Sequence, residues 1–205
     1  MDATPAQADF SDPAAELAQA RRAFADDPAA WWSTFADAGL ALEFAALAAK
    51  PGDELHRAVA RAAAACASEC LPRWSSLWPR DGRASLAVDA VERWADGRIS
   101  AHDLARATTG ALFASMSARC SEAHAARSAT EVIDLEAARQ GAASEVVHYV
   151  VRSAWDAAWC AALDETTSVA EGNRAAGMSL RRCADLVRQH VPAQLVLRAL
   201  ARSPS

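Results

Sequence analysis

The chain has 205 residues, of which 52% are hydrophobic and 23% charged, a composition typical of a globular protein and not of a disordered one. The net charge of −5 is uneven, because residues 1–54 hold ten acidic and three basic side chains, and such an acidic flank disfavours nucleic acid as a partner. The sequence has no secretory signal and no apolar run of membrane-spanning length, so we expect a cytoplasmic protein that does not bind membranes.

The composition favours an all-α fold. Alanine, the residue with the best helix propensity, makes up about a quarter of the chain, whereas Gly and Pro number eight each. No segment alternates apolar and polar residues as a strand would. We therefore predict a compact bundle of about eight to nine helices without a sheet, formed by a single domain over residues 12–202 that follows a flexible tail at 1–11.

The first third of the chain contains two Asp-Pro pairs that mark helix starts, since Asp caps a helix and Pro suits its first position. Asp12 and Asp27 are the predicted caps, and Gly39 is the predicted end of the second helix. A third helix, nearly all apolar, ends before Pro51. The predicted helices here are 12–25, 28–39 and 40–50.

Three further starts follow in the middle of the chain. Asp53 is predicted to cap a helix that Pro72 closes, and Asp81 to cap a helix over 82–95 that Gly97 ends. Ser100 and Asp103 resemble a capping box for a helix that reaches about residue 126. The predicted buried stripe of the 82–95 helix comprises Leu86, Ala87, Ala90, Val91 and Trp94.

The second half reads as one long helical segment over 131–165 with a kink at Gly141, followed by two amphipathic helices at 179–192 and 192–200. The spacing predicts that the long segment buries Val147, Val151, Ala154, Trp155 and Ala158. In the 179–192 helix it predicts inward positions for Leu180, Cys183, Leu186 and Val187.

Local motifs for catalysis are absent. The chain has no Gly-rich phosphate loop and no G-x-S-x-G nucleophile elbow, so we expect no cofactor and no enzymatic activity. An enzyme or accessory subunit whose pocket assembles from distant helices remains an alternative.

A second alternative is a metal-binding helical protein. Cys66 and Cys70 are spaced i,i+4, as are Cys120 and His124, and two facing helices with such pairs could supply four ligands to zinc. The competing interpretation is that small cysteines fill tight helix contacts, with His124 at the rim. Reduced, mostly buried thiols are also the simplest account of five cysteines in an intracellular chain.

The stretch from Trp78 to Gly97 combines two tryptophans with the charged trio Arg80, Asp81 and Arg83. Asp81 can cap a helix while it pairs with an arginine. The functional interpretation is a recognition loop with an exposed Trp or Arg, because these residues contribute much of the binding energy at protein interfaces.

This stretch, within the longer segment of residues 70–107, resembles the central signature of the Imm5-like family of bacterial immunity proteins. That signature has a Cys, an aromatic residue, Pro-x-Asp-x-Arg, an Ala-rich helix, a Trp and a Gly. The likeness extends over roughly 55–162 and includes an Ala-rich helix with an embedded histidine, here His148. Ala84 stands where the family usually has Pro. The matching positions are Cys70, Trp78, Pro79, Asp81, Arg83, Ala87, Ala90, Trp94 and Gly97.

The resemblance implies an all-α cytoplasmic protein from a toxin–immunity locus that binds and neutralises a cognate toxin without catalysis of its own. The acidic N-terminal region would then suit a basic, nuclease-type toxin, through electrostatic steering and charge pairing. The hypothesis assigns this contact to Asp26, Asp27 and Asp37.

Overall fold

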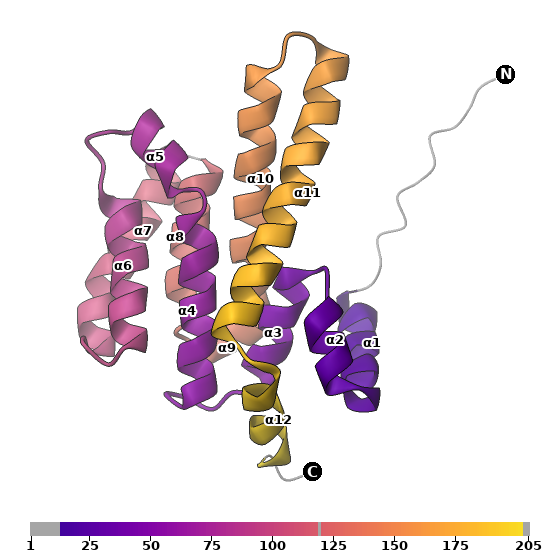
Figure 1. The fold of residues 1–205 in the computed structure, drawn as a ribbon. Coiled ribbons are helices and arrows are strands. Elements are labelled where there is room, and N and C mark those ends of the chain that lie inside the picture. The colour runs from indigo at the N-terminus through magenta and orange to yellow at the C-terminus, as the bar shows by residue number, and fades with distance from the viewer. Residues whose placement is uncertain (1–12, 119, 203–205) are drawn as a thin grey trace, which may run out of the picture.

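The computed structural model describes residues 13–118 and 120–202, and every regular element within these ranges is a helix (Figure 1). The predicted all-α class is therefore confirmed for the described part of the chain. The number of helices is higher than predicted, since eleven helices of seven residues or more form, besides the three-residue α9. The tail predicted at 1–11 and the predicted cap Asp12 lie outside the described residues, and the division of the chain at residue 12 stays a prediction.

The N-terminal helices are α1 (Pro13–Asp26), α2 (Pro28–Thr34) and α3 (Ala38–Ala48). Asp27 caps α2 as predicted, because its Oδ1 accepts a hydrogen bond of 3.0 Å from the Ala30 amide. The predicted end at Gly39 is wrong: Asp37 caps α3, so Gly39 lies in the first turn of that helix. A Cβ at Gly39 would lie 3.1 Å from the Ser144 Cβ, so the glycine allows the close approach of α3 to the segment around Ser144.

The next helices are α4 (Glu54–Ser68), α5 (Leu71–Leu77) and α6 (Arg83–Ala95). Asp53 caps α4 as predicted and accepts a 2.7 Å hydrogen bond from the His56 amide. Pro72 does not close this helix. It lies in the first turn of α5, where a missing amide proton leaves no helical hydrogen bond unmade.

A break divides the next predicted helix into α7 (Ala101–Ala118) and α8 (Ser121–Glu131). The predicted capping box is confirmed, since the Asp103 amide donates to Ser100 Oγ and the Ser100 amide donates to Asp103 Oδ2, both at 3.2 Å. The prediction of one continuous helix to residue 126 is wrong, because α8 starts anew at Ser121.

The last helices are α9 (Leu135–Ala137), a π-helical turn (Ala138–Ala142), α10 (Ala143–Ala161), α11 (Glu165–His190) and α12 (Ala193–Ala201). The kink at Gly141 is confirmed by its φ of 119°. α11 begins well before the predicted residue 179, although Cys183, Leu186 and Val187 are buried as predicted. The buried face of α10 is turned from the predicted one and comprises Ala143, Val146, Val147, Val150 and Ser153.

Figure 1 shows how these helices are arranged. The long α10–α11 hairpin rises beyond the other helices, with α4–α8 on one side of it, α1–α3 on the other and α12 below. One hydrophobic core extends from Phe24 to Ala199. Its buried positions are dominated by alanine, with Trp74, Leu42 and Leu55 among the largest fully buried side chains. Small side chains let helices approach closely, so the few large residues fill the remaining space. No described helix is long and apolar enough to cross a membrane.

Candidate functional site

Three residues, Trp74, Asp81 and Arg83, hold the turn between α5 and α6. They lie in or beside the stretch that resembles the family signature. The Nε1 of the fully buried Trp74 donates a 2.6 Å hydrogen bond to the backbone oxygen of Asp81. The Asp81 carboxylate accepts hydrogen bonds from both the amide and the guanidinium of Arg83, at 3.0 and 2.9 Å. The Arg83 hydrogen bonds hold the pKa of Asp81 below its usual value. The predicted N-cap Asp81 is one residue off, because Gly82 is the N-cap of α6 and offers no side-chain cap, but Asp81 still accepts a hydrogen bond from the amide of the first helical residue, Arg83.

This turn presents Trp78 to solvent. The side chain is 45% exposed, and its neighbour Leu77 is 52% exposed. Leu86 was predicted to be buried, but it is 61% exposed and lines the same hollow of about 610 Å³ as Leu77, Trp78 and Pro79. The buried stripe of α6 instead comprises Ala84, Ala87, Val88, Ala90, Val91 and Ala95.

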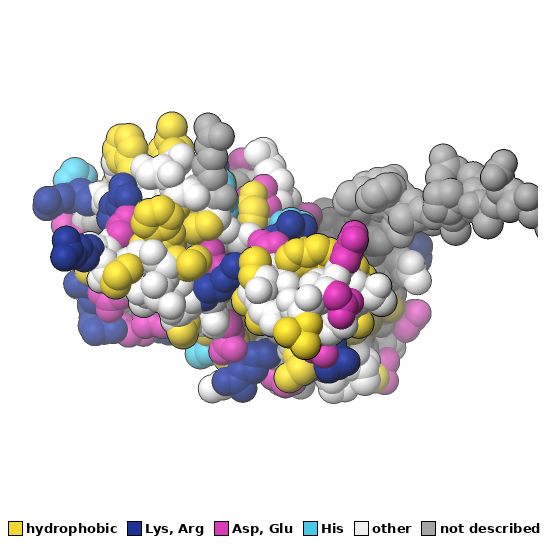
Figure 2. All heavy atoms as spheres, turned by 90° about the horizontal axis from the view of Figure 1, so that it is seen from above, with side chains coloured by type: hydrophobic (Ala, Val, Ile, Leu, Met, Phe, Trp, Pro, Cys, Tyr) yellow, Lys and Arg dark blue, Asp and Glu magenta, His cyan; other side chains and the backbone are white. Residues whose placement is uncertain are grey.

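α7 adds further large apolar side chains at this end. Gly110 faces α6, since a Cβ there would lie 4.0 Å from Arg83 Cγ, and three exposed apolar residues follow it along α7. Figure 2 looks onto this end of the molecule and shows hydrophobic side chains gathered over the α5–α7 part, at the left of the view. We name the exposed apolar side chains of this part the Trp78 surface. Its members are Leu77, Trp78, Leu86, Leu112, Phe113 and Met116.

Trp94 and Gly97 have structural roles. The Trp94 ring packs edge-on against the His56 ring, with centroids 4.9 Å apart. Gly97 ends α6 as predicted: its φ of 72° lies in the left-handed region, and its amide donates to the Trp94 carbonyl at 2.8 Å. His56 itself is buried between the Gly52 amide and the Val132 carbonyl, and burial lowers its pKa.

The acidic residues proposed for toxin contact are exposed, and two of them cap helices. Asp27 caps α2 and Asp37 caps α3, while Asp26 ends α1. Asp37 also lines a hollow of about 490 Å³ together with Glu43, Glu145 and His148. No Arg or Lys among the described residues pairs with these carboxylates, unlike most carboxylates on α4–α6.

Glu43 in this hollow is partly buried and is repelled by the negative charge of Asp37. The pKa of Glu43 is raised, chiefly by burial and further by the negative charge of Asp37, although a hydrogen bond from Ser144 opposes the shift. A cationic side chain placed here would relieve the repulsion between the carboxylates. The hollow is thus suited electrostatically to a basic partner.

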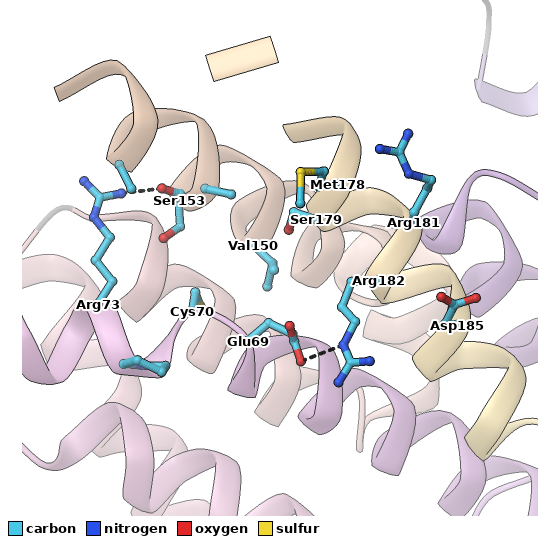
Figure 3. Close-up of a pocket in the computed structure, with 13 residues that line it drawn as sticks. Glu69, Cys70, Arg73, Val150, Ser153, Met178, Ser179, Arg181, Arg182 and Asp185 are labelled. Carbon is cyan, nitrogen blue, oxygen red and sulfur yellow. Dashed lines mark hydrogen bonds and ion pairs between the residues drawn. The ribbon is translucent and has the colours of Figure 1, made fainter. Parts of the chain in front are cut away.

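A groove of about 800 Å³ lies between the α4–α5 junction and the α10–α11 hairpin (Figure 3). At one wall Arg73 donates to the backbone oxygen of Ser153 and pairs at 3.2 Å with the carboxylate of Glu122. Glu122 is 1% exposed and also accepts a 2.6 Å hydrogen bond from Ser153 Oγ. At the opposite wall Arg182 pairs with Glu69 at 3.3 Å.

The chemistry of this groove is limited by these pairings. Arg73 compensates the charge of Glu122, and Arg182 compensates the charge of Glu69. Cys70 lines the groove, but burial raises its pKa far above the ordinary thiol range, so the thiol stays protonated at neutral pH and is a poor nucleophile. The groove therefore offers two ion pairs, the guanidinium of Arg181 and an unreactive thiol.

The four residues of the alternative metal site do not come together. Cys66 donates a 3.8 Å hydrogen bond to the Cys183 carbonyl, while His124 stacks on Tyr149 with ring centroids 4.9 Å apart. In the parts of the chain that the structure covers, no group of three or more His, Cys, Asp or Glu side chains could hold a metal ion. The interpretation of the cysteines as core residues fits Cys66, Cys70 and Cys183, which are buried.

The structure thus places the predicted site residues in separate regions: Trp78 and Pro79 at an exposed apolar end, Asp81 and Arg83 beneath them, and Asp37 at the acidic hollow. The apolar residues of α7 were missed by the sequence analysis, although their spacing carries a signal. Phe113 and Met116 share one helix face, opposite the face that packs into the core.

Comparison with known proteins identifies no relative, because no family model matches the chain, and no curated protein or solved structure is detectably similar to it.

Proposed function

We propose that this protein is an immunity protein, which binds a cognate bacterial toxin through the Trp78 surface and neutralises it. The orientation of α7 is the observation that carries the proposal. The face of α7 that packs into the core bears one large apolar residue, Leu104, beside the small residues Ala111, Ala114 and Ser115. Three further large apolar residues of this helix, Leu112, Phe113 and Met116, are exposed to solvent.

An amphipathic helix at the surface of a monomer normally points its large apolar residues inward. α7 exposes three of its four large apolar residues, and Leu77, Trp78 and Leu86, on α5, in the α5–α6 turn and on α6, are exposed as well. Contiguous exposed apolar patches mark protein interaction sites more often than scattered single residues do. A half-exposed Trp such as Trp78 is also a residue type often found as an energetic anchor in such sites. The resemblance over residues 70–97 supports a toxin as the partner.

Substitution at the Trp78 surface should abolish protection. If the protein has this function, a toxin gene lies beside its own gene, and cells that express that toxin should survive when they also produce the wild-type protein. Trp78→Ala and Phe113→Ala should each weaken binding by about 30-fold or more, because loss of a central aromatic anchor costs about 2 kcal/mol or more. The measurements are growth of the co-expressing cells and the Kd of the purified pair by calorimetry.

A matched control is Leu163→Ala, which removes a side chain of 97% exposure at the turn between α10 and α11, outside the Trp78 surface. This variant should protect cells as the wild type does. If Trp78→Ala and Phe113→Ala bind as tightly as the control, the Trp78 surface is not the interface. If the wild type neither binds nor protects, the function itself is wrongly assigned.

The acidic residues should accelerate binding of a basic toxin. Charge reversal at Asp27 and Asp37 would also remove helix caps, so the sharper change is Asp→Asn at 26, 27 and 37, since Asn caps a helix about as well as Asp. We expect the association rate of the triple variant to fall several-fold at low salt and its dependence on salt concentration to flatten. Surface plasmon resonance at several ionic strengths measures both quantities.

The control for this experiment is Asp134→Asn, which removes the charge of another helix cap on the second half of the chain. It should leave the association rate and its salt dependence as in the wild type. An unchanged rate for the triple variant would show that the acidic residues do not steer the toxin.

A further inference from the structure

A largely apolar hollow at the surface lies between α1, α3 and α12, at the end of α1 where α2 begins. It has a volume of about 450 Å³, within the range of pockets that hold small molecules. We name it the α1–α12 groove. Its principal lining residues are Arg21, Phe24, Phe44, Leu47, Leu197 and Leu200.

The interior of the α1–α12 groove is built from rigid apolar groups. Phe24 and Phe44 are almost fully buried and pack against each other with ring centroids 4.8 Å apart. Leu197 and Leu200 come from α12, and Leu200 is left 39% exposed. The groove therefore presents apolar surface to water, and an apolar chain that filled it would remove that surface from solvent.

One charge lies at the groove. Among the described residues that line it, Arg21 is the one that carries a charge, and it forms no hydrogen bond or ion pair with any other described residue. Arg22, the next residue of α1, does not line the groove. A guanidinium beside an apolar slot is complementary to an anionic group at the end of an apolar tail, because the carboxylate–guanidinium pair is geometrically specific.

We propose that the α1–α12 groove binds a small amphiphile with a carboxylate head and an alkyl tail, such as a medium-chain fatty acid. The tail lies against Phe24, Phe44 and the leucines of α3 and α12, and the carboxylate pairs with Arg21. This site is separate from the Trp78 surface, so its test does not depend on the toxin.

The experiment is calorimetric titration of the full chain with decanoate, below the concentration at which decanoate forms micelles. We expect saturable binding of one decanoate per chain. Arg21→Gln should weaken binding about tenfold or more, whereas the matched control Arg22→Gln should bind as the wild type does. Decyltrimethylammonium, which has the same tail and the opposite charge, should bind at least tenfold more weakly than decanoate.

A blocking variant separates the groove from other sites. Ala25 is exposed and lines the groove, so Ala25→Phe should fill its mouth and abolish decanoate binding without a change in melting temperature. The proposal is overturned if decanoate does not saturate, or if Ala25→Phe binds it as the wild type does. Equal losses in the Arg21 and Arg22 variants, or equal affinity for the cationic amphiphile, would also overturn it.

Discussion

Replacement of Arg73 by alanine is expected to destabilise the protein by about 3–5 kcal/mol, because it leaves a buried carboxylate without its counter-charge. Glu122 is 1% exposed, and Arg73 is the only basic group that pairs with it among the described residues. The hydrogen bond from Ser153 Oγ would remain, but one hydroxyl does not replace an ion pair in a site shielded from water. The free energy of unfolding in urea, measured for wild type and variant, provides the test.

Two further variants separate burial from charge. Arg174→Ala breaks an exposed pair with Glu171 and should change the free energy of unfolding by less than about 0.5 kcal/mol. The double variant Arg73→Met/Glu122→Met should be more stable than Arg73→Ala, since apolar replacements remove both charges together. If Arg73→Ala costs no more than Arg174→Ala, the buried pair does not support the α5–α8–α10 contact.

Helix starts and stops could be predicted from the sequence because each depends on a few neighbouring residues. Asp27 and Asp53 cap their helices by bonding an amide three residues ahead, and Ser100 and Asp103 satisfy each other in the same way. Gly97 and Gly141 adopt positive φ angles where the pattern indicated a stop and a kink. Pro72 misled the prediction because proline is compatible with both the end of one helix and the first turn of the next.

The side of each helix that faces the core could not be predicted as well. Periodicity identifies the stripes on a helix, but in a chain so rich in alanine the buried stripe is frequently the one with small residues. α6 buries Ala84, Ala87 and Val88 and exposes Leu86. The choice depends on how closely neighbouring helices approach, which is a property of the assembled bundle and not of one segment.

The candidate site was predictable only where it is local. Trp78 stood out because it adjoins the Pro-x-Asp-x-Arg motif, but Phe113 and Met116 lie on another helix that only the fold brings alongside. The same holds for the buried ion pair, whose members Arg73 and Glu122 come from different helices. A glutamate in the first turn of a helix, as Glu122 is in α8, looks like a solvated residue until its partners are placed.

Trp74 and Trp78 lie four residues apart, but their replacement by alanine should change the free energy of unfolding by very different amounts. Trp74 is fully buried and donates its Nε1 proton to the Asp81 carbonyl, so Trp74→Ala should cost about 3–5 kcal/mol of unfolding free energy through the cavity it leaves. Trp78 is 45% exposed and its ring packs on that of Trp74 with centroids 6.1 Å apart, so Trp78→Ala should cost less, about 1 kcal/mol. Unfolding in guanidinium chloride, followed by circular dichroism, measures both.

The conservative change Trp74→Phe is informative about the turn itself. It keeps an aromatic ring in the core but removes the hydrogen bond to Asp81, which contributes about 1 kcal/mol, so its cost should lie between those of the two alanine variants. The contrast between the two tryptophans also decides how the binding experiment is interpreted. If Trp78→Ala were as unstable as Trp74→Ala, a loss of toxin binding would reflect unfolding. A stable Trp78→Ala that no longer protects cells would identify this side chain as a direct contact.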